Sequence, residues 1–289
     1  MVTSLVAGLA VGAIYAFIAV GYNLTFLTAR VFNFAHAHLL VLAMFVSVAL
    51  LHIGVPPLAT VAITGIGIAL LAVVEELLAV GPLRKRSGGS HMELVTTLGV
   101  AEIITGVIIV VWGSDPIRVP SPVELGSFDI LGGRIQNADL VIIGVVLIFS
   151  GALALIIRRT RFGHSALAQS EDREAAALRG INIAWLSVAG FALSGLVVGL
   201  AALPIGGRTF AVVSIALTLA IKGFIAMTLG GVGSIGGAII GGLSLGVIEA
   251  LTERVLGTSF RDIAVFLVFV AVVLLRPQGI FGSVKQRIV

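Results

Sequence analysis

The sequence predicts an all-α protein that lies in a membrane as a bundle of about eight to nine segments, some of them broken or re-entrant. Hydrophobic residues make up 58% of the 289 residues and charged residues only 11%, whereas roughly a quarter of an ordinary soluble domain is charged. The apolar residues gather in long runs, and 36 glycines lie among them. These observations predict a single polytopic membrane domain over residues 1–289.

The apolar runs give the expected segments in chain order. A helix needs about 20 mostly apolar residues to cross the hydrocarbon core. The candidates are residues 3–28, 34–51, 57–80, 94–112, 139–157, 185–204, 209–229, 233–251 and 261–275. Several of these runs are short, so the predicted number of segments is a range.

Basic residues between the segments predict the orientation. Residues 84–86 and 158–179 form two basic loops, and residues 276–287 form a basic tail. Loops rich in Lys and Arg stay in the cytoplasm. This rule places the C-terminus inside, the N-terminus outside, and the loop of residues 113–138 outside.

Four pairs of glycines have the spacing that lets membrane helices approach closely. The pairs are Gly8 and Gly12, Gly195 and Gly199, Gly237 and Gly241, and Gly242 and Gly246. Hydrophobicity cannot drive association inside lipid, and small residues at the helix interface allow close packing instead. We therefore expect a tight bundle.

A glycine-rich stretch interrupts the apolar sequence between two segments. Gly231-Val-Gly-Ser-Ile-Gly236 matches a dinucleotide-binding pattern, but that pattern needs a strand, a turn and a helix in a soluble unit. The stretch fits a break between membrane helices better, and such breaks are tolerated in protein-buried positions or beside a watery cavity. Gly230, Gly231, Gly233 and Ser234 are thus candidates for lining a solute path, with a purely structural break as the alternative.

A second polar interruption, Asn33-Phe-Ala-His36, lies between the first two segments. Interrupted helices indicate binding paths in transporters, so Asn33, Phe34 and His36 are candidate path residues. The alternative is an ordinary turn in which Asn33 caps the next helix. We expect no metal site, because His36 and His38 point to different faces of a helix.

Two charged residues, Glu102 and Lys222, lie within apolar segments. Charges inside a membrane are expensive and indicate function by default. The favoured interpretation is structural pairing with each other or extension toward the interface. The alternative is a proton-coupling group in a secondary carrier.

Residues 158–183 form a charged island that cannot lie in hydrocarbon. Within the island, Ser170 or Asp172 is a candidate N-cap, Glu174 lies in the first turn, Arg179 in the last, and Gly180 follows. This pattern predicts a short helix over about residues 171–179. The island is either a docking surface for another protein or a solvated loop helix.

Several kinds of chemistry have no support in the sequence. There is no phosphate-binding loop of the G-x-x-x-x-G-K-[ST] type, no catalytic Ser/His/Asp or H-E-x-x-H arrangement, and no cysteine. The formal charge of +4 is small and falls between apolar runs, so nucleic acid is not an expected partner. The chain is expected to have no catalytic residues, and any ATP that drives it must bind elsewhere.

At these segments the chain resembles the permease subunits of bacterial ABC importers for branched-chain amino acids, and among them the Asn-Phe-Ala-His type of the two paired permeases. The resemblance rests on stretches that run in order from end to end: 32–36, 97–99, 161–163, 174–182, 191–195, 222–224, 229–238 and 276–282. It implies a multi-pass protein of the bacterial cytoplasmic membrane.

The resemblance also implies partners and a coupling site. The expected partners are a second permease subunit, two cytoplasmic ATPase subunits that bind ATP, an extracytoplasmic substrate-binding protein, and membrane lipid. No cofactor is expected in this chain. The coupling helix that contacts the ATPase would lie in the island, with site residues Phe162, Gly163, Asp172, Glu174, Ala175, Ala176, Arg179 and Gly180.

One departure from the family pattern leaves the solute open. The family usually continues after Asn-Phe-Ala-His with glycine and glutamate, whereas this chain has Ala37 and His38. Branched-chain or other apolar amino acids are the expected solutes, and urea-like amides remain open. The functional alternatives are a proton-coupled secondary carrier and a passive channel for small amides such as urea.

Overall fold

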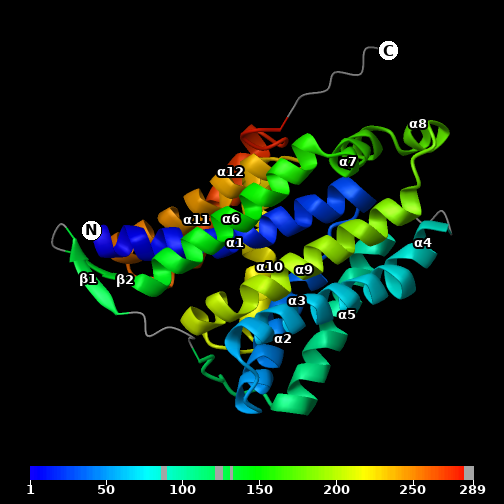
Figure 1. The fold of residues 1–289 in the computed structure, drawn as a ribbon. Helices are drawn as coiled ribbons and strands as arrows, with labels where there is room; N and C mark the ends of the chain where they lie inside the picture. The colour runs from blue at the N-terminus through cyan, green and yellow to red at the C-terminus, as the bar shows by residue number, and fades with distance from the viewer. Residues whose placement is uncertain (86–89, 121–125, 131–132, 283–289) are drawn as a thin grey trace. The chain divides into compact units, whose positions relative to one another are not determined.

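The computed structural model describes residues 1–85, 90–120, 126–130 and 133–282, and it is built almost entirely of helices (Figure 1). Eight helical stretches in these residues are long and apolar enough to cross a membrane. A further apolar helix, Ile215–Gly230, is shorter. The prediction of an all-α membrane bundle of about eight to nine segments is confirmed.

The elements follow one another in the order α1 (Val2–Ala29), α2 (Ala35–His52), α3 (Pro57–Glu75), η1 (Glu76–Val80), α4 (Gly81–Lys85), α5 (Ser90–Trp112), β1 (Ser127–Ile130), β2 (Gly133–Gln136), α6 (Asn137–Arg159), α7 (Arg161–Glu171), α8 (Arg173–Leu178), α9 (Ile183–Thr209), α10 (Ile215–Gly230), α11 (Ile235–Leu256), η2 (Thr258–Phe260) and α12 (Arg261–Leu275). The η1 element is a single π-helical turn that continues α3.

The chain divides into two compact units, each assembled from separate stretches of sequence. Unit 1 holds Met1–Asn23, Gly126–Ser150 and Lys222–Val289, and unit 2 holds Leu24–Leu125 and Gly151–Ile221. Three of the four boundaries fall within α1, α6 and α10, and the fourth lies just before β1. That residues 1–289 act as one domain stays a prediction.

Unit 2 is built around the packing of α3 on α9, with α2 beside both. The helices approach closely at glycines: a Cβ on Gly199 would lie 2.7 Å from the Cα of Gly65, and a Cβ on Gly195 would lie 2.7 Å from the Cβ of Ala72. Real Cβ atoms essentially never come so near. The predicted role of Gly195 and Gly199 in helix contact is therefore confirmed.

Unit 1 uses the same device between α1 and α11. A Cβ on Gly8 would lie 2.8 Å from the carbonyl oxygen of Gly246, and one on Gly12 would lie 2.7 Å from that of Gly242. A third glycine pair, Gly237 and Gly241, packs against the backbone of α10. All four predicted pairs thus lie at helix contacts.

The segments 139–157 and 233–251 match α6 and α11 closely, but the helix pair near residue 209 differs from the prediction. Helix α9 continues through Pro204 to Thr209, and α10 begins only at Ile215. The intervening Ala211 forms an isolated antiparallel bridge with Ile117, with both N–H···O distances 2.9 Å. A backbone pairing of this kind has no hydropathy signal.

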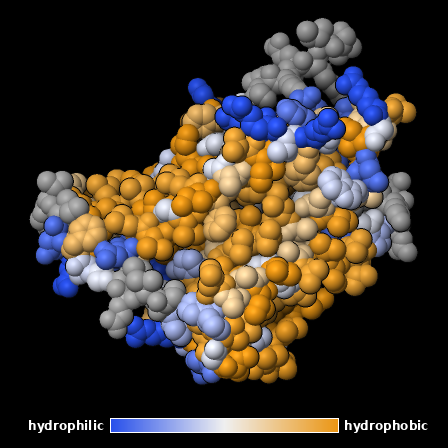
Figure 2. Space-filling view, viewed as in Figure 1, coloured by the Kyte–Doolittle hydropathy of each residue, from blue (hydrophilic) through white to orange (hydrophobic). Residues whose placement is uncertain are grey.

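The predicted external loop, residues 113–138, contains a β-hairpin that hydropathy did not indicate. Strands β1 and β2 pair antiparallel with Ser127 opposite Gln136. Gly133 lies against Val2 and Thr3 at the start of α1. The outer surface over the helices is mainly apolar, and hydrophilic residues gather around α7 and α8 (Figure 2), as the sequence of the island predicts.

Candidate functional site

The Asn33–His36 interruption forms a tight, buried turn between α1 and α2 in unit 2. Arg30, directly after α1, has a φ of 59°, a left-handed conformation that breaks the helix. The Asn33 side-chain oxygen accepts a hydrogen bond from the Ala35 N–H at 2.9 Å. Its amide group donates to the Glu75 carboxylate at 3.0 Å. Asn33 thus supports the start of α2 and joins this turn to the end of α3, but it is not the N-cap that the alternative interpretation expects, because Phe34 occupies that position.

His36 connects the same turn to α9. Its ring Nδ1 lies 2.9 Å from the hydroxyl of Ser194, and both side chains are buried. His38 instead lies 3.3 Å from the carbonyl of Phe34 within its own helix. The two histidines face different neighbours, and the described residues hold no group of three side chains suited to a metal ion.

Phe34 is only partly exposed, at the junction with α2. The polar centre formed by Asn33, His36, Glu75 and Ser194 therefore draws on α2, α3, α9 and the turn before α2. We call these four residues the turn centre. Glu75 and Ser194 were missed by the sequence reasoning, although a carboxylate at the end of an apolar run is a recognisable signal.

The glycine-rich stretch is a turn between α10 and α11 in unit 1. Helix α10 ends at Gly230. Gly231 and Gly233 have φ angles of 107° and 82°, which residues with a side chain rarely adopt. The Ser234 hydroxyl then caps α11 by accepting from the Gly237 N–H at 3.1 Å. The predicted helix break is confirmed.

Asn23, a fully buried residue of α1, holds this turn from one side. Its amide donates to the Ser234 carbonyl at 3.1 Å, and its oxygen accepts from the Gly233 N–H at 2.7 Å. Both bonds satisfy backbone groups that the break frees from helical pairing. Sequence reasoning missed Asn23 because no local pattern links it to residues about 210 positions away.

The C-terminal segment holds the same turn from the other side. The N–H groups of Ile280 and Phe281 donate to the carbonyls of Leu229 and Gly230 at 2.9 and 3.1 Å. Gly231 leaves no room for a side chain against this segment. These contacts fit a protein-buried structural break. That Gly230, Gly231, Gly233 and Ser234 line a solute path stays a prediction, as does their approach to Asn33 and His36, which belong to the other unit.

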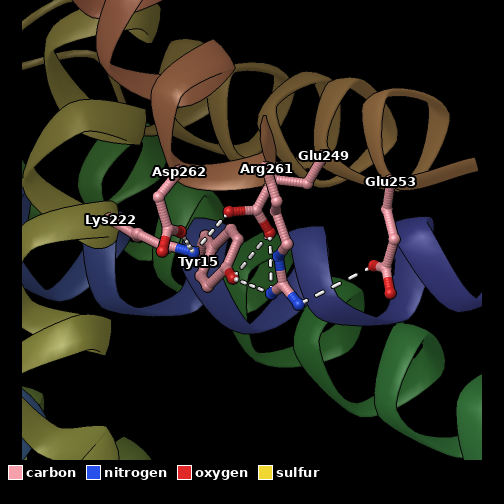
Figure 3. Close-up of polar contacts among 6 residues, drawn as sticks. All are labelled: Tyr15, Lys222, Glu249, Glu253, Arg261 and Asp262. Atoms are coloured by element: carbon pink, nitrogen blue, oxygen red, sulfur yellow. Dashed lines mark hydrogen bonds and ion pairs between the residues drawn. The ribbon is translucent and has the colours of Figure 1, made fainter. Parts of the chain in front are cut away.

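A charge cluster in unit 1 surrounds the buried Glu249 of α11 (Figure 3). Its carboxylate pairs with Lys222 at 2.5 Å and with Arg261 at 3.0 Å, and it accepts a hydrogen bond from the Tyr15 hydroxyl at 2.8 Å. Lys222 also pairs with Asp262 at 2.8 Å. The cluster joins α1, α10, α11 and α12.

This cluster corrects the expected pairing of Lys222 with Glu102. Lys222 has two carboxylate partners within unit 1, while Glu102 lies exposed on α5. The general expectation that Lys222 is structurally paired is confirmed, but the partner named from sequence was wrong. Glu249 and Asp262 lie in later segments, and pairing across helices depends on a packing that hydropathy does not specify.

The charged island forms two helices rather than the one predicted over residues 171–179. Helix α7 begins after Thr160, whose hydroxyl accepts from the Gly163 N–H at 3.2 Å. Helix α8 begins after Asp172, whose carboxylate accepts from the N–H groups of Glu174 and Ala175, both at 3.0 Å. Asp172 is therefore the N-cap. Ser170, the other candidate, lies inside α7.

The predicted coupling residues in this pair of helices include both buried and exposed positions. Phe162 stacks edge-to-face on Trp185, with ring centroids 6.2 Å apart, and Gly163 packs on the backbone of Ile157. Ala176 is buried, whereas Glu174 and Arg179 are exposed. Gly180 ends the helix with a φ of 84°, as predicted for the position after a helix C-terminus.

Apolar side chains stand exposed among these charges. Leu178 is 90% exposed and Trp185 is 60% exposed. Exposed apolar groups with a charged rim are found where a protein meets another protein or a membrane. We call residues 161–185 the island surface.

Comparisons with known proteins agree over most of the chain. Residues 4–275 match the sequence model of a family described as the permease component of branched-chain amino acid transport systems. The chain is 30% identical over 297 residues to the high-affinity branched-chain amino acid transport system permease protein BraD of Pseudomonas aeruginosa, covering 96% of this chain and 94% of that one. It is also 30% identical to LivH of Salmonella typhimurium, a protein with the same description, covering 95% and 93%.

Proposed function

The chain belongs to the family of permease components of branched-chain amino acid transport systems, and we infer from this that it is the transmembrane permease subunit of an ATP-driven ABC importer for branched-chain amino acids. The observation that carries the inference is the match of the family over residues 4–275. It is a multi-pass membrane protein, with eight stretches able to span in the part of the chain that the structure describes, and permeases of this family work with partner subunits.

We propose the partners more specifically. Two cytoplasmic ATPase subunits would bind the ATP, a second permease subunit would complete the path, and an extracytoplasmic binding protein would deliver the solute. The chain itself would hold no cofactor. Basic residues around the island surface and the C-terminal tail support a cytoplasmic position for both.

The island surface is the proposed docking site for the ATPase. Helix α8 presents an exposed acidic residue, Glu174, at its N-terminal end, where a negative charge interacts favourably with the helix dipole. Leu178 adds an exposed apolar contact. An apolar side chain flanked by charges supplies both the burial and the orientation that a protein interface needs.

The turn centre of unit 2 and the turn at residues 230–234 of unit 1 are each proposed to contact the solute. A path for a zwitterion with an apolar side chain needs few charges, so that the solute is released again. The helices supply mainly small and aliphatic residues, and Asn33 and His36 add donors and acceptors. Selection among apolar amino acids would then rest largely with the binding protein.

Reconstitution tests the function. The chain is co-expressed with the ATPase and second permease of its own organism, purified, and placed in proteoliposomes with the binding protein. ATP-dependent leucine uptake that requires every subunit is expected. Proton-driven uptake by the chain alone would instead identify a secondary carrier, and non-saturating flux of urea without ATP would identify a channel.

A charge reversal tests the docking site. Glu174→Arg should lower the amount of ATPase that co-purifies about tenfold, because it reverses a charge at the α8 N-terminus and on the proposed interface. The matched control is Asp115→Arg, which reverses an exposed acidic residue in the predicted external loop. Equal ATPase recovery in both variants would remove the docking site from α8.

A further inference from the structure

Gln169 of α7 is fully buried although its helix carries the island surface. Its side-chain amide donates a hydrogen bond to the carbonyl oxygen of Thr28 at 2.6 Å. Thr28 lies in the last turn of α1, which ends at Ala29. The last four carbonyls of a helix have no partner within it, so Gln169 supplies the partner that this helix end lacks.

Thr28 is also held by α9. Gly190 lies so close to the Thr28 side chain that a Cβ there would overlap it. The Thr28 hydroxyl turns back to the Leu24 carbonyl at 2.8 Å, and Thr28 is fully buried. The end of α1 is therefore enclosed between α7, through Gln169, and α9, through Gly190.

The same helix end leads directly into the turn centre. After Thr28 the chain breaks at Arg30 and reaches Asn33 and His36 within eight residues. His36 contacts Ser194 of α9, and Ser194 lies four residues after Gly190. Residues four apart share one face of a helix. One face of α9 thus contacts the segment on both sides of the Arg30 break.

We propose that Gln169 is a positioning residue that transmits movement of the island surface to the turn centre. If α7 moved without the end of α1, the Thr28 carbonyl and the Gln169 amide would both lose a buried hydrogen bond, which is unfavourable away from water. The two therefore move together. The Asn33–His36 turn follows, because only four residues separate Thr28 from Asn33.

This proposal rests on the proposed function, in which the island surface receives the force of ATP hydrolysis. It adds a route from that surface to the polar turn, all of it within unit 2. A route of contacts becomes a coupling only when a change along it alters the response of one site to the other. The test therefore measures coupling rather than either activity alone.

The test variant is Gln169→Met, which keeps the length of the side chain and removes the donor. Assembled transporters in proteoliposomes are assayed for leucine uptake and for ATP hydrolysis in the same preparation. The number of ATP molecules hydrolysed per leucine taken up should rise about tenfold, while the ATPase still co-purifies. The control is Ser47→Ala, which removes an equally buried hydroxyl of α2 that donates to the Ala43 carbonyl of its own helix at 2.7 Å and lies outside the island surface and the turn centre; its ratio should stay unchanged.

A second variant keeps the proposal testable if Gln169→Met does not fold. Thr28→Ala keeps the carbonyl that Gln169 binds but removes the side chain that contacts Gly190, and it should raise the same ratio about threefold. Uptake and hydrolysis that fall together, with the ratio unchanged in whichever variants fold, would overturn the proposal. Failure of the proposed function would look different, because the unmodified chain would then show no ATP-dependent uptake.

Discussion

Replacing Glu249 by leucine should destabilise unit 1 strongly. Glu249 forms ion pairs with Lys222 and Arg261 and accepts a hydrogen bond from Tyr15. The Lys222 and Glu249 side chains are only 8% and 3% exposed. Removing one partner of a buried ion pair costs about 3–5 kcal/mol, because the other charge stays buried without compensation. Lys222 retains Asp262, so we expect a loss near the lower end, about 3 kcal/mol.

The matched control is Asp262→Asn, which removes the other carboxylate partner of Lys222. Its contact with Lys222, at 2.8 Å, is almost as short as that of Glu249, but the Asp262 side chain is 82% exposed. Exposed ion pairs contribute about 0–1 kcal/mol, because water already solvates the charge. The contrast between the two variants therefore reports the burial of the Glu249 carboxylate together with its further contacts to Arg261 and Tyr15, since the distances to Lys222 differ little.

Thermal unfolding of the purified chain in lipid nanodiscs measures both variants. By the scaling of soluble domains, each kcal/mol shifts the midpoint by roughly 2–4 °C for a chain of this size, so Glu249→Leu should lower it by about 6–12 °C and Asp262→Asn by less than about 4 °C. The double variant Lys222→Met with Glu249→Leu should recover part of the loss. Equal shifts for the two single variants, or no recovery, would refute the account of the cluster.

Two further predictions concern helix contact and the glycine turn. Gly12→Leu should destabilise unit 1 by about 1–3 kcal/mol through overpacking against Gly242. The control is Gly144→Leu, where a Cβ meets nothing within 4 Å, and its stability should change by no more than about 0.5 kcal/mol in the same thermal assay. Similar losses at both sites would contradict close packing at Gly12. Asn23→Leu should speed hydrogen exchange of the Gly233 N–H, which donates to Asn23 at 2.7 Å, and unchanged exchange would show that the turn does not depend on Asn23.

The helices could be predicted from the sequence because a single local property decides them. Any run of about 20 apolar residues is driven into the bilayer, and its backbone must then be helical so that its N–H and C=O groups form hydrogen bonds with each other. The glycine pairs were equally readable, since close approach of two helices needs small residues at fixed spacing. The β-hairpin at Ser127–Gln136 escaped this reasoning because hydropathy says nothing about pairing in a loop.

The polar contacts could be predicted only in part. Local caps follow from short patterns, and Asp172 was among the two residues expected to begin a helix in the island. The partner of Lys222, by contrast, depends on which face of α11 meets α10, and no feature near Lys222 distinguishes Glu249 from Glu102. The link from Gln169 to Thr28 joins residues 141 positions apart and has no pattern at all.

The two breaks share a property that bears on how a solute could pass. An asparagine side chain closes each break. Asn23 of α1 bonds to Gly233 and Ser234 of the glycine-rich turn, and Asn33, within the other break, bonds to Ala35 and Glu75. In this conformation the polar groups bind one another. A solute that binds at either break must replace one of these hydrogen bonds, and it must offer a donor or acceptor of its own to do so. The ammonium and carboxylate groups of an amino acid meet that requirement, and a purely apolar molecule does not. Substituting Asn33 by leucine should therefore impair transport more than it impairs assembly with the ATPase.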